Sequence, residues 1–162
     1  MRIYTVPFLS ANLPATNAMD LWDIAPATNK PVALLGMSLD NVGIGADAGD
    51  AQEEMLPITI VRGLATVGSG GSSGTAMPVQ ENDTAASFTA RVNDTTVAVV
   101  GGGATNNIAG LGWNVRVPLR EFWPLEMCPT CSAAQTRIVV KITTAGADAV
   151  TISGTLWVAE LL

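Results

Sequence analysis

The sequence predicts an all-β fold: a single antiparallel β-sandwich, jelly-roll-like, with long Gly-rich loops, formed by residues 1–162 as one domain. Apolar and polar residues alternate with a period of two in several segments, which is typical of half-buried strands. The chain contains 16 glycines and nine prolines, which suggests many turns. A sustained helical stripe is absent from windows longer than about ten residues. The length also suits one domain.

Four segments alternate most clearly. In residues 149–159, four apolar side chains fall on one face and Trp157 falls on the polar face; the four are Val150, Ile152, Leu156 and Val158. The same pattern predicts strands over 137–143, 111–117 and 86–92. Within 111–117, we expect Trp113 and Val117 on the same apolar face.

Weaker alternation predicts five further strands, over residues 2–9, 19–24, 32–39, 56–62 and 96–100. Pro7 and Pro57 favour edge or strand-end positions, because proline donates no ladder hydrogen bond. Evidence for helix is limited to residues 48–55, where one helical turn is expected, with Asp47 or Asp50 as its cap. About nine short strands between turn residues are typical of a sandwich, a jelly roll or a barrel.

Two glycine-rich segments are predicted to lie outside regular strands. Gly68–Gly74 has the composition of a flexible linker, and we expect a long exposed loop there. Gly101–Gly112 is expected to be a hairpin connection or a bulged strand. Neither segment matches a phosphate-binding loop, because the first lacks the Gly-Lys-Ser/Thr ending and the second has no basic residue.

Composition excludes several classes of function. The net charge is −6, and the eight basic residues are scattered singly, so we expect no nucleic-acid partner and no anionic membrane partner. Histidine is absent, which removes every His-based catalytic triad. The sequence shows no apolar run of signal-peptide or membrane-helix type, so synthesis in the cytoplasm is expected.

Cys128-Pro129-Thr130-Cys131 is the first candidate for chemistry. A C-x-x-C motif can be a redox pair or half of a zinc site. Zinc in a closed site needs four ligands, and this chain supplies two cysteines and no histidine. A structural role is favoured, either as free thiols or as a local disulfide. A redox pair and a metal shared between subunits stay open as alternatives.

The other candidates are interpreted as structural. The acidic stretch Asp47–Glu54 lacks EF-hand spacing and is expected to be a solvated or partner-facing loop, with cation binding left open. Asn82 and Asn93 each begin an Asn-x-Thr triplet, the pattern of an N-glycosylation site. We expect turns at both triplets, because Asn and Asp tolerate tight turns. The four tryptophans are expected in the core or in subunit contacts. We therefore assign no catalytic, cofactor-binding or metal-binding residues and expect no enzyme activity.

Seven segments, in this order and spacing, resemble one family of small virion proteins of tailed phages and prophages. They are Asp20–Ile24, Pro26-Ala27 with Lys30-Pro31, Gly49–Glu54, Arg62-Gly63 with Gly68–Gly71, Phe88–Ala90 with Asn93, Asn114–Arg116 and Ser153–Leu161. The cysteine pair and Gly101–Gly103 lie outside the pattern.

The resemblance implies a head decoration, or cement, protein. Such a protein would bind the major capsid protein of an assembled phage head, bridge neighbouring subunits and lie on the outer surface of the virion. Three-fold positions in a capsid lattice suggest a homotrimer. The alternative is a carbohydrate-binding β-sandwich module of a phage tail or fibre, which would present exposed, coplanar tryptophans.

Overall fold

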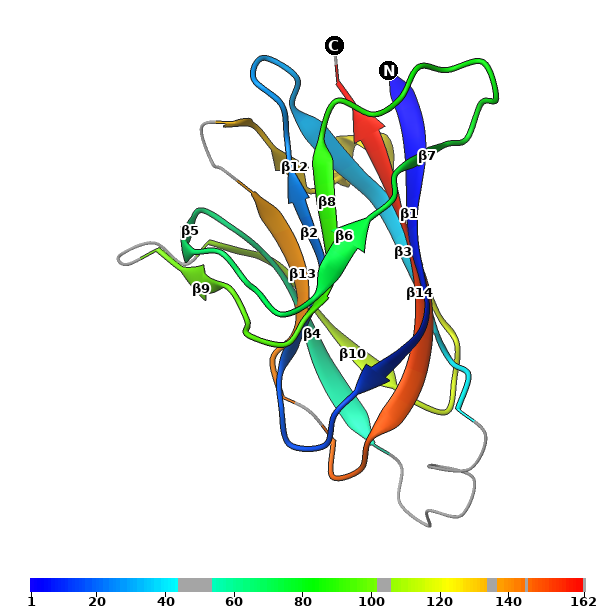
Figure 1. Ribbon diagram of the computed structural model, residues 1–162, viewed down its shortest axis with the longest axis vertical. Coiled ribbons are helices and arrows are strands. Elements are labelled where there is room, and N and C mark those ends of the chain that lie inside the picture. The colour runs from blue at the N-terminus through cyan, green and yellow to red at the C-terminus, as the bar shows by residue number, and fades with distance from the viewer. Residues whose placement is uncertain (44–53, 102–105, 134–136, 145, 162) are drawn as a thin grey trace.

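A computed structural model describes the chain except residues 44–53, 102–105, 134–136, 145 and 162. Two six-stranded antiparallel sheets pack face to face (Figure 1). Sheet A has the order β11-β3-β14-β1-β7, with β12 also pairing with β3, and sheet B has the order β10-β4-β13-β2-β8-β6. The strands of sheet A are β1 (Arg2–Leu13), β3 (Val32–Asn41), β7 (Met77–Pro78), β11 (Leu119–Phe122), β12 (Thr130–Cys131) and β14 (Val150–Glu160). Those of sheet B are β2 (Met19–Ala25), β4 (Met55–Arg62), β6 (Ser72–Gly74), β8 (Thr89–Asp94), β10 (Asn107–Asn114) and β13 (Ile138–Ile142).

Eight of these strands pair in nested order. β1 pairs with β14, β2 with β13, β3 with β11 and β4 with β10. The first strand of this set therefore pairs with the last, the second with the last but one, and so on inward. Successive pairs alternate between the two sheets, which is the jelly-roll arrangement. The prediction of an antiparallel, jelly-roll-like sandwich is confirmed.

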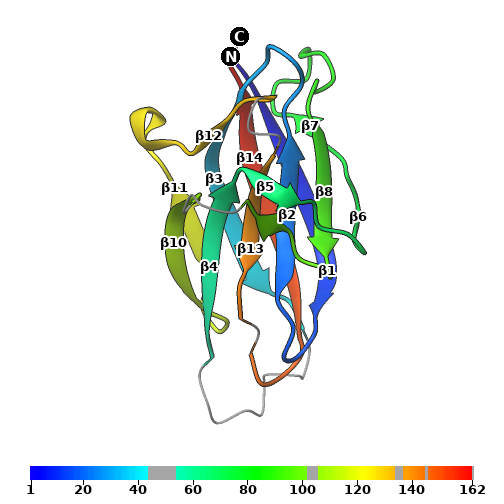
Figure 2. The same ribbon diagram turned by 90° about the vertical axis from the view of Figure 1, so that its left-hand side faces the viewer.

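The segment between β4 and β10 adds the remaining strands. β7 extends sheet A beside β1, and β8 and β6 extend sheet B beside β2. β5 (Leu64–Thr66) and β9 (Val99–Val100) form a separate two-stranded sheet. This small sheet lies against the outer face of sheet B, where Val61 and Val139 pack with Ala98 (Figure 2).

The core lies between the two sheets and is made of the inward residues of both. Trp22 and Phe8 pack with ring centroids 5.0 Å apart, and the indole N–H of Trp22 donates to the Val6 carbonyl at 2.8 Å. Trp113 is buried as well, and its indole N–H donates to the Val117 carbonyl at 2.9 Å. Both large side chains therefore bury their apolar surface without leaving a donor unsatisfied.

Alternation weakens in β2 because the strand contains a bulge. The register with β13 passes from Trp22 opposite Val140 to Asp20 opposite Lys141, so Leu21 is an extra residue. Leu21 and Trp22 both enter the core as a result, while Asp20 and Asp23 are both buried outside the main core cluster. A strict period-two alternation would instead place Leu21 and Trp22 on opposite faces of the strand.

Three local predictions need correction. Gly68–Gly74 is largely exposed, as expected, but it is not a long loop: Ser69 bridges Thr96, and residues 72–74 are strand β6. Val117 is 56% exposed, because β10 ends at Asn114 and the chain turns. β8 begins at Thr89, three residues later than expected.

The prediction for the second glycine-rich segment is confirmed where the structure describes it. β10 carries a register shift between Asn107 and Ala109, so it is a bulged strand. Pro57 lies near the start of β4, and its carbonyl accepts the Thr143 N–H just beyond the end of β13. The proline therefore occupies a place where a ladder donor is not needed.

Candidate functional site

The outer face of sheet A carries a pair of aromatic side chains. Trp157 on β14 and Phe122 on β11 are both in register with Gly36 on the intervening strand β3. Their ring centroids lie 5.0 Å apart at an interplanar angle of 54°. A Cβ at Gly36 would lie 2.3 Å from Cδ1 of Phe122, so glycine is what allows the phenyl ring to lie across β3 and reach the indole.

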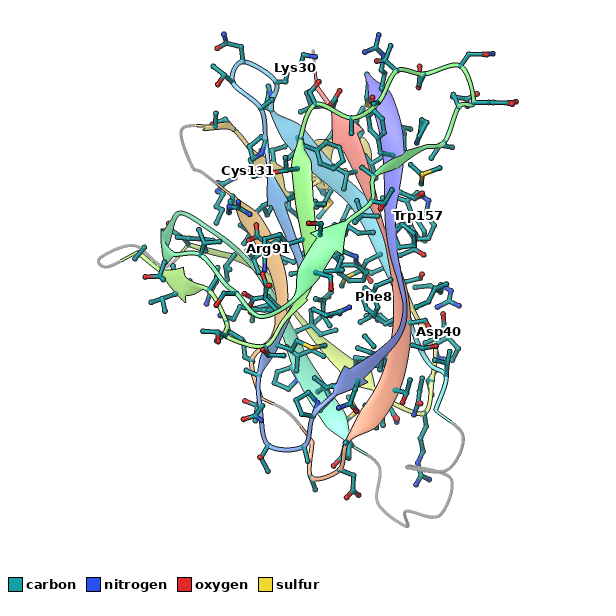
Figure 3. The ribbon with its side chains drawn as sticks, viewed as in Figure 1. Phe8, Lys30, Asp40, Arg91, Cys131 and Trp157 are labelled. Carbon is teal, nitrogen blue, oxygen red and sulfur yellow. The ribbon has the colours of Figure 1, made fainter. Side chains whose placement is uncertain are left out.

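Two exposed aliphatic side chains follow Phe122 along the chain. Phe122 is 56% exposed, and Leu125 and Met127 on the 3₁₀ helix η1 (Leu125–Met127) are 58% and 70% exposed. We call Phe122, Leu125, Met127 and Trp157 the apolar patch. Figure 3 shows Trp157 on sheet A, directed away from the core side chain Phe8. Phe122, which contacts Trp157, and the exposed side chains of η1 shortly after it in the chain are therefore candidates for an interaction site.

The segment that carries the patch is anchored to sheet A. The Trp123 N–H donates to the Leu35 carbonyl at 3.0 Å. Cys128 packs against Ala33 and Ala159 on the outer face of the sheet. The patch is therefore held on the sandwich by the residues on either side of η1, which reduces the conformational entropy lost on docking.

A second unusual feature is a buried ionic network on the outer face of sheet B. Asp20, Asp23 and Asp94 are each about 1% exposed. Each carboxylate has a cationic partner: Lys141 lies 4.0 Å from Asp20, Arg137 lies 2.9 Å from Asp23, and Arg91 lies 2.6 Å from Asp94. Three carboxylates thus face three cations, which reduces the cost of burying charge on this face.

Burial raises the pKa of Asp20 to about 6. The Ala98 N–H, which donates to Asp20 Oδ2 at 2.7 Å, and the Lys141 ammonium oppose that rise. Oδ1 has no hydrogen-bond partner in the described part of the chain. Burial also raises the pKa of Asp23, with Arg137 opposing it. Desolvation is therefore stronger than ion pairing at both carboxylates.

The network attaches the segment between β4 and β10 to the sandwich. Both backbone polar groups of Ala98 are held, since its N–H donates to Asp20 and its carbonyl accepts from Lys141 Nζ at 2.8 Å. The Gly71 N–H donates to Asp94 Oδ1 at 2.8 Å. A Cβ at Gly68 would lie 2.4 Å from Asp20 Oδ2, so the backbone approaches the carboxylate closely only because residue 68 is glycine.

This arrangement supports attachment better than catalysis. Each carboxylate is paired with a cation and is covered. A cavity of about 300 Å³ lies elsewhere, near β6 and β8, and its lining has no ionisable side chain: Ser73, Gly74, Ala76, Ala85, Ala86, Phe88, Thr89 and Ala90. Among the residues that the structure describes, no group of three or more His, Cys, Asp or Glu side chains could hold a metal ion.

The two cysteines are free and buried in different environments. Cys131 belongs to the main core between the sheets, whereas Cys128 belongs to the small cluster on the outer face of sheet A. Burial raises the pKa of Cys131 to about 11 and also raises that of Cys128. Both groups therefore stay as thiols near neutral pH, which favours the structural interpretation over a redox pair.

The remaining predicted positions fall as follows. Residues 47–53 of the acidic stretch lie outside the described residues. Asn93 adopts φ 59°, as expected for a turn residue, but it lies within β8. Trp22 and Trp113 are in the core, as interpreted, and Trp157 is in the apolar patch.

Sequence reasoning missed the ionic network. The available signal was two aspartates in the apolar strand segment Met19–Ala25, since a buried carboxylate requires a partner. Their partners could not be identified in the same way, because Lys141 in β13 and Arg137 just before β13 lie far along the chain.

Comparisons with known proteins give no relative: no family model, no curated protein and no solved structure matches this chain. Among the described residues, none of the helices is long and apolar enough to cross a membrane. The fold and the surfaces above therefore define a jelly-roll β-sandwich with an exposed apolar patch and a buried ionic network.

Proposed function

We propose that this chain is a structural virion protein, a capsid decoration or cement protein that binds the assembled head of a tailed phage and bridges neighbouring capsid subunits. The apolar patch is the observation that carries the proposal. It presents aromatic and aliphatic side chains on a stiff sandwich, and tryptophan is among the residues that most often supply the binding energy in protein interfaces. The resemblance of the sequence to phage virion proteins selects the partner.

The mechanism is docking by many small contacts. One patch of four side chains is small for a stable interface, which usually buries roughly 1,200–2,000 Å² in total. Copies bound at symmetry-related positions of a shell, where three of them around a three-fold position form the expected homotrimer of the bound state, engage several such contacts at once, and their affinities combine by avidity. The protein therefore prefers assembled shells to free capsid subunits.

Co-sedimentation tests the proposal. The protein is mixed with empty heads or with unassembled capsid protein, at low salt and at roughly 0.5 M salt, where the Debye length falls to a few ångströms. Binding to heads alone, little changed by salt, is expected, because the patch contains no charged side chain. Equal binding to both forms, or no binding to heads, contradicts the proposal.

Matched variants locate the contact. Leu125→Ser with Met127→Ser removes two exposed apolar side chains of the patch and should weaken head binding at least about tenfold, since each tenfold step is about 1.4 kcal/mol. Leu9→Ser is the control, because Leu9 is 82% exposed and belongs to β1, outside the patch. If both variants bind heads like the original protein, the patch is not the docking surface.

The carbohydrate-binding alternative has weaker support. Its aromatic platform requires coplanar exposed rings, whereas Phe122 and Trp157 are tilted by 54° and Trp22 and Trp113 are buried. Binding to a panel of bacterial surface glycans, lost in Trp157→Ala, would favour this alternative over the decoration role.

A further inference from the structure

The four edges of the two sheets differ in how well they are protected against pairing with another strand. In sheet A, β11 has four residues and carries Arg120 and Glu121, and β7 has two residues and contains Pro78. In sheet B, β6 has three residues. Short strands, charges and proline are the usual means of blocking an edge. These three edges are therefore poor templates for pairing.

β10 lacks these three protections, and its bulge between Asn107 and Ala109 lies before Gly110. It has eight residues, contains no charge and no proline, and pairs with β4 on one side only. The uncharged region is longer than the strand, since no charged residue occurs between Asp94 and Arg116. A long, uncharged edge strand is a template for another strand.

The register shows which backbone groups are free. The Pro57 carbonyl accepts from Thr143 next to β13, so the backbone groups of Pro57 are directed toward β13. Alternate residues of an antiparallel strand face opposite neighbours, so Leu56 and Ile58 face β10, where they pair with Trp113 and Leu111. Gly110 and Gly112 consequently direct their N–H and carbonyl groups to the open edge, and both are exposed.

We infer that a second copy of this chain pairs with this edge, so that two β10 strands run antiparallel about a two-fold axis with Gly110 of one copy opposite Gly112 of the other. In this register, each glycine pair exchanges two backbone hydrogen bonds, and Leu111 lies opposite Leu111. A self-complementary contact of this kind closes after two copies.

Charge and shape favour a second copy as the occupant. Two chains of net charge −6 repel each other, and the repulsion is weakest where both surfaces are uncharged. Glycine leaves the outer face bare: a Cβ at Gly110 would meet nothing within 4 Å, and one at Gly112 would meet only Met55 Cε, at 3.5 Å. On the inner face, Leu111 is partly buried and would gain cover from its copy.

This inference goes beyond the proposed function and is independent of it. The β10 edge and the apolar patch are different surfaces, so a two-fold contact could join neighbouring decorations on a shell while the patch contacts the shell. The experiment below uses the isolated protein alone, so its failure would leave head binding untouched.

Sedimentation equilibrium of the purified protein at about 10 to 500 µM is the test. A concentration-dependent species at twice the 16.7 kDa monomer mass is expected. Gly110→Lys with Gly112→Lys should shift it to the monomer, because lysines on both facing strands repel each other across the axis. Ser73→Lys on the short edge strand β6 is the matched control and should keep the dimer.

Two outcomes overturn the inference: a monomer throughout the concentration range, or an oligomer of any size that persists in the double lysine variant. Circular dichroism establishes that this variant is folded. If it is not, hydrogen exchange on the original protein decides. The amides of Gly110 and Gly112 should become more protected as concentration rises, and unchanged exchange overturns the inference.

Discussion

At the scale of single residues, the absence of histidine does not leave the protein without a group that titrates near neutral pH. Asp20 is buried with Lys141 and the Ala98 amide, and desolvation raises its pKa from 3.8 to about 6. The groups around it are ionic as well: Asp23, Asp94, Arg91 and Arg137 belong to the same network. Burial therefore produces a titration that composition alone does not reveal.

This pKa predicts how stability depends on pH. The folded-state pKa lies above the unfolded value, so the folded state binds the proton more tightly. The stability contributed by protonation is fully present below pH 3.8 and is lost as pH rises through about 6. A shift of this size corresponds to at most about 3 kcal/mol.

Asp20→Asn isolates the effect. The uncharged side chain cannot titrate, so the stability of the variant relative to the original protein should rise between pH 4 and pH 7. Urea unfolding at each pH measures the difference. Parallel stability curves for the two proteins would show that Asp20 does not titrate in this range.

Gly36 supports a second prediction at the residue scale. Gly36→Ala would place a Cβ 2.3 Å from Phe122 Cδ1 and 2.6 Å from the Glu121 carbonyl oxygen. We expect a loss of about 1–3 kcal/mol in unfolding free energy, typical of overpacking, together with displacement of Phe122 from Trp157. The measurement is urea denaturation followed by tryptophan fluorescence.

Gly110→Ala is the control for that measurement. It adds the same methyl group to a strand where nothing lies within 4 Å, so little destabilisation is expected. Equal losses in the two variants would mean that strand propensity, and not the contact with Phe122, explains the effect of Gly36→Ala.

At the scale of elements, the segment Gly68–Gly74 shows how a flexible composition becomes ordered. Glycine at positions 68 and 71 permits close approach to Asp20 and to the Val92 carbonyl, where a Cβ would lie 2.4 Å and 2.2 Å from an oxygen. The Asp94 carboxylate then holds the Gly71 N–H. The glycines here serve close packing, although their sequence is typical of a linker.

Hydrogen exchange checks this prediction. In the original protein, the Gly71 amide should exchange slowly, because it is bonded to a buried carboxylate. In Asp94→Ala, the amide loses its acceptor and Arg91 loses its partner, so residues 69–74 should exchange faster. Exchange at the rate of a free loop in the original protein would contradict the structure of this segment.

At the scale of the whole molecule, the two sheets share one core. Tyr4, Val6 and Leu156 from sheet A and Trp22 and Ile58 from sheet B belong to the same buried cluster. Neither sheet buries its inner face without the other. We therefore expect residues 1–162 to unfold in one cooperative transition, as single domains of this size usually do.

Leu156→Ala tests this cooperativity. Leu156 is fully buried, so its truncation should cost about 2–5 kcal/mol. Far-ultraviolet circular dichroism, which reports on both sheets, and tryptophan fluorescence, to which Trp22 and Trp113 in sheet B and Trp157 in sheet A contribute, should shift to the same lower midpoint. Separate midpoints would show that the sheets unfold independently.

The sequence predicted the fold well wherever one strand face is apolar and the other polar. β13 and β14 match their expected ranges within one residue, and the inward side chains of β14 are the predicted ones. Prediction failed at β11, which has no clear alternation, and at β6, whose Ser-Ser-Gly sequence is typical of a loop, and it placed the start of β8 three residues too early. Local periodicity reports only whether one face of a strand is buried.

The sequence by itself determined that the chain forms an antiparallel β-sandwich and that it lacks histidine chemistry, because alternation and composition are local properties. Only the tertiary structure decided that Asp20, Asp23 and Asp94 meet their cations, that Phe122 reaches Trp157 across Gly36, and that β10 is left at an open edge. These features join residues up to about 120 positions apart, and their partners are chosen by strand order and register. A bulge of one residue in β2 reverses which side chains face the core, so the ionic network could not be predicted from periodicity alone.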